Sequence, residues 1–123
     1  MNGQAIVLVF MGGGLGSVIR FLIGLAVKRF VQFELPLGTL IANVLAAVLV
    51  ATVMGFSTKL NLNARYTLLF ATGLCGGLST FSTFSWETVQ MLQNNQIIGA
   101  FANIALNLVL CLSLVYVVYK WTV

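Results

Sequence analysis

One stretch interrupts an otherwise hydrophobic part of the chain: Gly73-Leu74-Cys75-Gly76-Gly77-Leu78-Ser79-Thr80-Phe81-Ser82-Thr83-Phe84-Ser85-Trp86-Glu87. It contains three glycines, five hydroxyl residues and two phenylalanines. Adjacent glycines weaken a helix, because glycine loses more backbone entropy on folding than any other residue. The pair Gly76-Gly77 therefore predicts a break that divides a long helix into two half-helices.

The whole chain has the composition of an integral membrane protein. Of its 123 residues, 60% are hydrophobic and only 7% are charged, whereas about a quarter of the residues in soluble domains are charged. Each helical span needs about 20 apolar residues, so four spans use nearly the whole length. We expect an all-α, single-domain membrane protein over residues 1–123, with spans at about 5–30, 37–56, 66–93 and 97–119. The first span is expected to be retained rather than cleaved as a signal peptide.

A helix break at membrane depth restricts what can surround it. The freed N–H and C=O groups must face protein, water or an ion. A hydroxyl-rich break is therefore a candidate binding or conduction site. Close helix packing by small residues is the alternative, and Gly12 and Gly16 in the first span form a pair of that kind.

Polar side chains also lie inside the second and fourth spans. Thr39 and Asn43 are four residues apart, so they share one helical face. Asn103, Asn107 and Cys111 repeat at the same interval and form a polar stripe along the fourth span. An unsatisfied amide in hydrocarbon is costly, so these side chains either join helices or line a polar site.

The interior is rich in hydrogen-bond donors and poor in acids. Glu87 is the only carboxylate within a span, whereas cation and proton-coupled carriers usually keep a buried carboxylate for their ion. Phe81 and Phe84 lie three residues apart on one face, and an aromatic ring is electropositive at its edge. This combination favours a small anion, with ordinary aromatic packing as the alternative for the two rings. Arg20, inside the first span, either reaches the nearer interface or places a cation at an aqueous mouth.

Several classes of protein are not expected. The chain has no His, and Cys75 and Cys111 both lie in apolar segments, which leaves no zinc site, no disulfide framework and no catalytic acid–base pair. The six Lys and Arg residues are scattered, so nucleic acid is not an expected partner.

The charges near the span ends give little preference for one orientation in the membrane. One side would hold the termini and the 57–65 loop, with Lys59, Arg65 and Lys120, and the other would hold Lys28 and Arg29. Such a small difference is a weak signal for a rule that depends on Lys and Arg asymmetry. We therefore expect that copies insert both ways and pair about a two-fold axis in the membrane plane.

Taken together, these residues resemble the Fluc (CrcB) family of bacterial fluoride channels over essentially the full chain. The most specific match is the run from Gly76 to Ser85 followed by Glu87. Further matches are Gly38-Thr39-Leu40 with Asn43, and the glycine-rich region 12–16 that leads to Arg20.

The resemblance implies an antiparallel, dual-topology homodimer of four-helix subunits in the bacterial inner membrane. It also implies two passive, fluoride-selective pores per dimer that export fluoride from the cytoplasm, with the lipid bilayer, fluoride and a second copy of the chain as partners. At the dimer centre it implies a structural sodium ion, held by the backbone carbonyls of Gly76 and Ser79.

The same resemblance implies a set of pore residues: Phe81, Phe84, Asn43, Ser82, Thr83, Thr39, Asn103, Asn107 and Arg20. Family members often place Tyr and Ser along the fourth span, where this chain has Asn103, Asn107 and Cys111. A proton-coupled exporter of the small multidrug resistance type is the alternative function. That class depends on a glutamate in its first helix, where this chain has Arg20 and no acidic residue.

Overall fold

The computed structural model describes residues 3–31 and 34–123. The elements follow one another as α1 (Gly3–Phe30), α2 (Leu37–Leu60), α3 (Ala64–Tyr66), η1 (Thr67–Cys75), α4 (Gly76–Leu78), α5 (Phe81–Gln93) and α6 (Ile97–Thr122). η1 has the wider turns of a π-helix. Elements α3 to α5 together make one long, apolar segment, so the described residues contain four helical segments long and apolar enough to cross a membrane. The prediction of an all-helical chain with four spans is confirmed.

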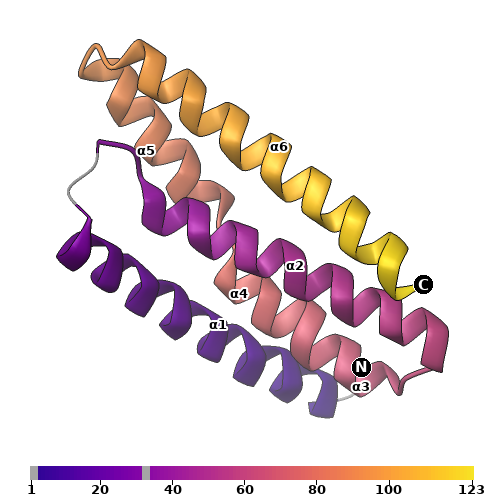
Figure 1. The fold of residues 1–123 in the computed structure, drawn as a ribbon. Coiled ribbons are helices and arrows are strands. Elements are labelled where there is room, and N and C mark those ends of the chain that lie inside the picture. The colour runs from indigo at the N-terminus through magenta and orange to yellow at the C-terminus, as the bar shows by residue number, and fades with distance from the viewer. Residues whose placement is uncertain (1–2, 32–33) are drawn as a thin grey trace.

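The four segments lie side by side with α2 at the centre of the bundle (Figure 1). α2 packs against α6 on one side and against α1 and η1 on the other, while α1 also packs against α4. The start of α1, the α2–α3 connection and the C-terminus lie at one end, and the end of α1, the start of α2 and the α5–α6 connection lie at the opposite end. This is the arrangement that four successive spans require.

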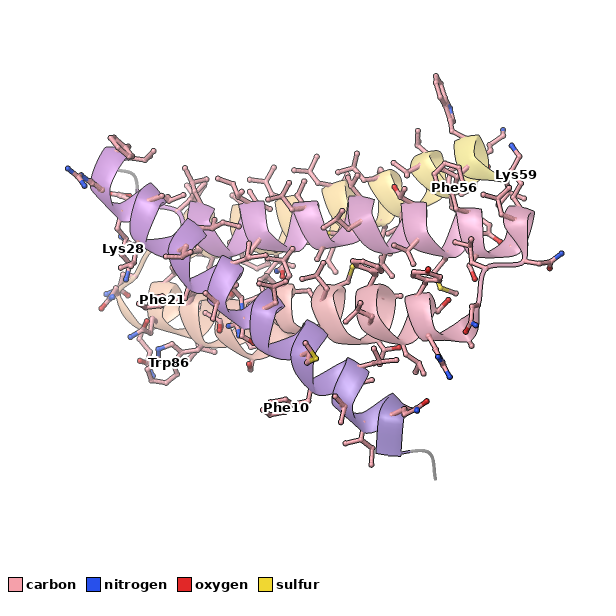
Figure 2. All side chains as sticks on the ribbon, turned by 90° about the horizontal axis from the view of Figure 1, so that it is seen from below. Phe10, Phe21, Lys28, Phe56, Lys59 and Trp86 are labelled. Carbon is pink, nitrogen blue, oxygen red and sulfur yellow. The ribbon has the colours of Figure 1, made fainter. Side chains whose placement is uncertain are left out.

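The tightly buried core is small and lies between α2 and the third segment. Its cluster consists of Ala42, Ala46, Cys75 and Leu78. Large apolar side chains point outward instead, and Figure 2 shows Phe10 and Trp86 directed away from the bundle, where they are 79% and 62% exposed. An apolar exterior of this extent suits a bilayer rather than water.

The second span is longer than expected. It was predicted to end near residue 56, but α2 continues to Leu60 and ends at Asn61, whose left-handed backbone (φ 48°, ψ 47°) donates its N–H to Ser57 O. The hydroxyl of Thr58 donates to Met54 O at 2.9 Å, so the polar residues of this turn continue the helix. The sequence therefore becomes polar about one turn before the helix ends.

The predicted break at Gly76-Gly77 is wrong in position. Gly76 has helical dihedral angles (φ −64°, ψ −36°) and begins α4. The extended residues are Ser79 (ψ 153°) and Thr80 (φ −153°, ψ 117°), which separate α4 from α5 (Figure 1). Thr80 Oγ1 accepts the N–H of Thr83 at 3.3 Å. The hydroxyl therefore caps the new helix, and this cap locates the interruption.

The glycines act instead at the contact between α1 and the third segment. A Cβ atom added to Gly12 would overlap the backbone at Leu69 O and Leu74 N, and one added to Gly77 would overlap Gly13 O. Gly12 and Gly16 are both buried, which confirms the predicted small-residue contact.

We expect Gly12→Ala to destabilise the protein, because the added methyl has no space against neighbouring backbone atoms. Overpacking of this kind costs about 1–3 kcal/mol. Gly14→Ala is the matched control, since nothing lies within 4 Å of its added Cβ. Thermal unfolding in detergent, followed by size-exclusion chromatography, should show a lower midpoint for Gly12→Ala alone. Equal midpoints for the two variants would contradict the packing argument.

Candidate functional site

The side chain of Asn43, on α2, forms hydrogen bonds with the interrupted backbone at Thr80. Its Oδ1 accepts the N–H of Thr80 at 2.8 Å, and its Nδ2 lies 3.5 Å from Thr80 O. In an uninterrupted α-helix the Thr80 N–H would donate to Gly76 O. The side-chain amide therefore replaces a helical hydrogen bond and keeps the peptide satisfied.

The side chain of Arg20, on α1, contacts the backbone just before the interruption. Its Nε donates to Gly77 O at 3.1 Å, and Ser17 Oγ lies 3.5 Å from the same oxygen. The half-buried Arg20 side chain is thus directed toward the third segment. Arg20 also lines a hollow of about 670 Å³. The residue therefore contacts the third segment and also presents part of its cationic side chain to this hollow.

That hollow, which we call the vestibule, begins among the helix ends near Leu35 and Asn94 and reaches inward to Thr80 and Thr83. On its wall, Thr39 Oγ1 donates to Glu87 Oε1 at 2.9 Å. The other carboxylate oxygen of Glu87 is buried and has no hydrogen-bond partner within residues 3–31 and 34–123.

Phe81 and Phe84 are neighbours, as their spacing indicated. Their ring centroids are 5.6 Å apart and the planes are tilted by 46°. Their surroundings differ, because Phe81 is 77% exposed while Phe84 is 8% exposed. Nearby, Thr80 Oγ1 lies 3.3 Å from Ser82 Oγ and 3.1 Å from Thr83 Oγ1. The start of α5 thus gathers three hydroxyls beside the ring pair.

The two asparagines of α6 are buried and hydrogen-bonded. Asn43 Nδ2 donates to Asn107 Oδ1 at 2.9 Å, and Asn107 Nδ2 donates to Asn103 Oδ1 at 3.1 Å. Asn103 Nδ2 then donates to Thr88 Oγ1 at 2.9 Å. Thr88 was not among the predicted site residues, because only its contact with Asn103 on another helix identifies it.

A second hollow, of about 430 Å³, opens on the outer face of α2, the third segment and α6; we call it the depression. Both Gly76 and Ser79 lie on its wall and are exposed. Across the described residues, none of the recorded hydrogen bonds outside the helices ends on either carbonyl oxygen. Free carbonyls of this kind are suitable ligands for a hard cation.

The predicted site residues divide between these two hollows. Arg20, Thr39 and Thr83 line the vestibule, whereas Asn43, Phe81, Phe84 and Asn107 line the depression. Ser82 and Asn103 line neither. Thr80 lines both, so the interruption separates the two spaces.

Comparison with known proteins adds independent information. Residues 7–119 match the family model described as CrcB-like protein, Camphor Resistance (CrcB). The chain is 42% identical over 108 residues to the fluoride-specific ion channel FluC of Flavobacterium psychrophilum, covering 87% of each chain. It is 38% identical over 114 residues to the protein of that name from Methanococcus aeolicus, covering 93% of this chain and 91% of the other. For that of Cronobacter sakazakii the identity is 48% over 101 residues, covering 81% and 79%. These matches extend over nearly all four spans, and the chain belongs to the CrcB family.

Proposed function

We propose that this protein is a passive, fluoride-selective channel that exports fluoride from the cytoplasm across the bacterial inner membrane. Its similarity to proteins named fluoride-specific ion channel FluC supports this function. The observation that carries it is the interruption at Ser79 and Thr80, where amide, hydroxyl and ring-edge groups gather between two hollows. A protein of this class is a transporter and not an enzyme.

The chemistry of fluoride explains why these groups are suitable. Fluoride is small and strongly hydrated, so a selective path must replace its water with hydrogen-bond donors and still bind weakly enough to release the ion. Aromatic ring edges add positive electrostatic potential without a full charge. The proposed path is formed by Phe81, Phe84, Asn43, Ser82, Thr83, Thr39 and Asn107, with Arg20 attracting the anion to the vestibule. Asn103, predicted from the sequence as a pore residue, lines neither hollow and takes part through its hydrogen bond with Asn107.

Passive export needs no coupled proton. Hydrofluoric acid is a weak acid that enters cells in neutral form and ionises inside, where the negative membrane potential drives the anion out. α1 contains no acidic residue, which argues against a multidrug exporter that binds protons and cations through a glutamate on its first helix.

We further propose an antiparallel homodimer with two pores. The wide opening of the depression and the 77% exposure of Phe81 support a surface that a second copy covers. The nearly balanced charges at the two ends of the bundle support insertion in both orientations; Lys28 and Lys59 lie at opposite ends in Figure 2.

A sodium ion at the dimer centre is part of the same proposal. Gly76 and Ser79 are exposed, and among the described residues no hydrogen bond outside the helices ends on their carbonyl oxygens. Such oxygens suit this ion, since hard cations take oxygen ligands. When bound, sodium would supply positive charge that holds the interrupted segments of two subunits together.

Liposomes that contain only the purified protein test the proposed function. We expect rapid fluoride efflux, measured with a fluoride electrode, and little chloride efflux from matched liposomes. The closely spaced donors of the site replace the hydration shell of the small fluoride ion but do not fit the larger chloride ion. Proton-driven uptake of a lipophilic cation would support the exporter instead. Absence of fluoride release from liposomes that contain folded protein would refute the channel.

Phe84→Ile and Phe81→Ile test the role of the rings. An aliphatic side chain lacks the ring quadrupole, so fluoride efflux should fall by about tenfold, the size of a favourable aromatic contact. Phe10→Ile is the matched control, because Phe10 is 79% exposed on α1 and lines neither hollow. Unchanged efflux in both pore variants would rule out the ring-edge role.

A further inference from the structure

A continuous set of hydrogen bonds joins the interruption to the first turn of α5 through two other helices. It begins at one backbone group, passes through four side chains and ends at another backbone group. Its five bonds are Thr80 N to Asn43 Oδ1 (2.8 Å), Asn43 Nδ2 to Asn107 Oδ1 (2.9 Å), Asn107 Nδ2 to Asn103 Oδ1 (3.1 Å), Asn103 Nδ2 to Thr88 Oγ1 (2.9 Å) and Thr88 Oγ1 to Phe84 O (2.8 Å). We call this set the relay.

The groups at both ends of the relay require the same donor-to-acceptor direction along it. A backbone N–H only donates, so Thr80 must face the oxygen of Asn43. A backbone carbonyl only accepts, so the single hydroxyl hydrogen of Thr88 is used at Phe84 O, and Thr88 Oγ1 must accept from Asn103. Each amide has its oxygen on one side and its nitrogen on the other, and the orientation of all three amides follows.

Three of the four relay side chains are shielded from solvent. Asn103, Asn107 and Thr88 are 2%, 6% and 7% exposed, whereas Asn43 is half-buried on the wall of the depression. An unpaired buried amide is costly, and bonds in such a chain strengthen one another. The loss of one bond is therefore transmitted to the next.

The ends of the relay enclose the phenylalanine pair. Thr80 directly precedes Phe81, and the other end is the carbonyl of Phe84. The relay thus anchors this short segment at both ends, through α2 and α6. Neither Asn103 nor Thr88 lines the vestibule or the depression, so any effect of these two residues on an ion must pass through others.

We propose that Asn103 and Thr88 are positioning residues. Through the relay they fix the orientation of the Asn43 amide and the position of the Phe81–Phe84 segment for fluoride passage. This inference rests on the proposed function for its consequence, but the relay itself can be measured without any transport.

The first measurement is hydrogen exchange at the Thr80 amide, followed by NMR in protein that carries ¹⁵N on its threonines. Thr88→Val keeps the side-chain shape but removes the acceptor for Asn103. We expect exchange at Thr80 to accelerate by about three- to tenfold, the effect of losing one hydrogen bond. Asn103→Leu removes the same link together with the next one, from Asn107 Nδ2 to Asn103 Oδ1. It should accelerate exchange at Thr80 at least as much, so it tests the relay if Thr88→Val does not fold.

Two control variants separate positioning from general disturbance. Thr88→Ser keeps the hydroxyl and should retain slow exchange at Thr80. Thr52→Val removes a hydroxyl that bonds back to Val48 O at 2.8 Å, within α2, and no side-chain amide donates to it among the recorded bonds. This control should leave exchange at Thr80 unchanged.

Fluoride efflux from liposomes then tests the functional consequence. Efflux should fall with Thr88→Val and Asn103→Leu by about the same three- to tenfold factor, and Thr88→Ser and Thr52→Val should match the parent protein. Wild-type exchange at Thr80 in both broken-link variants would overturn the relay. Accelerated exchange with unaltered efflux would overturn its positioning role. If the parent protein releases no fluoride, the proposed function fails, while exchange at Thr80 still decides the relay.

Discussion

The hydrogen bond from the Thr80 N–H to Asn43 Oδ1, 2.8 Å long, is the contact on which the site depends. It takes the donor that an α-helix would give to Gly76 O. Among the described residues, no hydrogen bond outside the helices then ends on Gly76 O, the chain is extended at Ser79 and Thr80, and α5 begins at Phe81. The hydroxyls and rings at the start of α5 follow directly after this replacement.

Such an interruption is stable in a membrane only if nearby groups satisfy the backbone. Each nearby element supplies part of what is needed. Arg20 and Ser17 of α1 contact Gly77 O, and the hydroxyl of Ser79 donates to Cys75 O at 2.9 Å. Close approach of α1 makes the contacts of Arg20 and Ser17 possible, and it requires glycines on both sides. Packing and polar chemistry are therefore coupled, because a bulkier residue at the contact would displace the donors as well.

Sequence reasoning predicted the parts of the fold that follow from hydrophobic length and helical spacing. The four spans, the neighbouring rings of Phe81 and Phe84 and the packing role of Gly12 follow from such rules. The break was misplaced because glycine only weakens a helix, whereas the extended residues here are Ser79, which follows α4, and Thr80, whose hydroxyl caps α5. Thr88 was missed because its partner Asn103 is on another helix, and tertiary pairing of this kind leaves no local pattern.

The most direct test of the central role of Asn43 is the backbone ¹³C chemical shifts of Ser79 and Thr80, measured by NMR on labelled protein in bilayers. In the parent protein both residues should have the shifts of extended backbone. In Asn43→Leu the Thr80 N–H loses its acceptor and should return to Gly76 O, so the shifts should move toward helical values. Helical shifts in the parent protein, or unchanged extended shifts in Asn43→Leu, would contradict the view that this one side chain maintains the interruption.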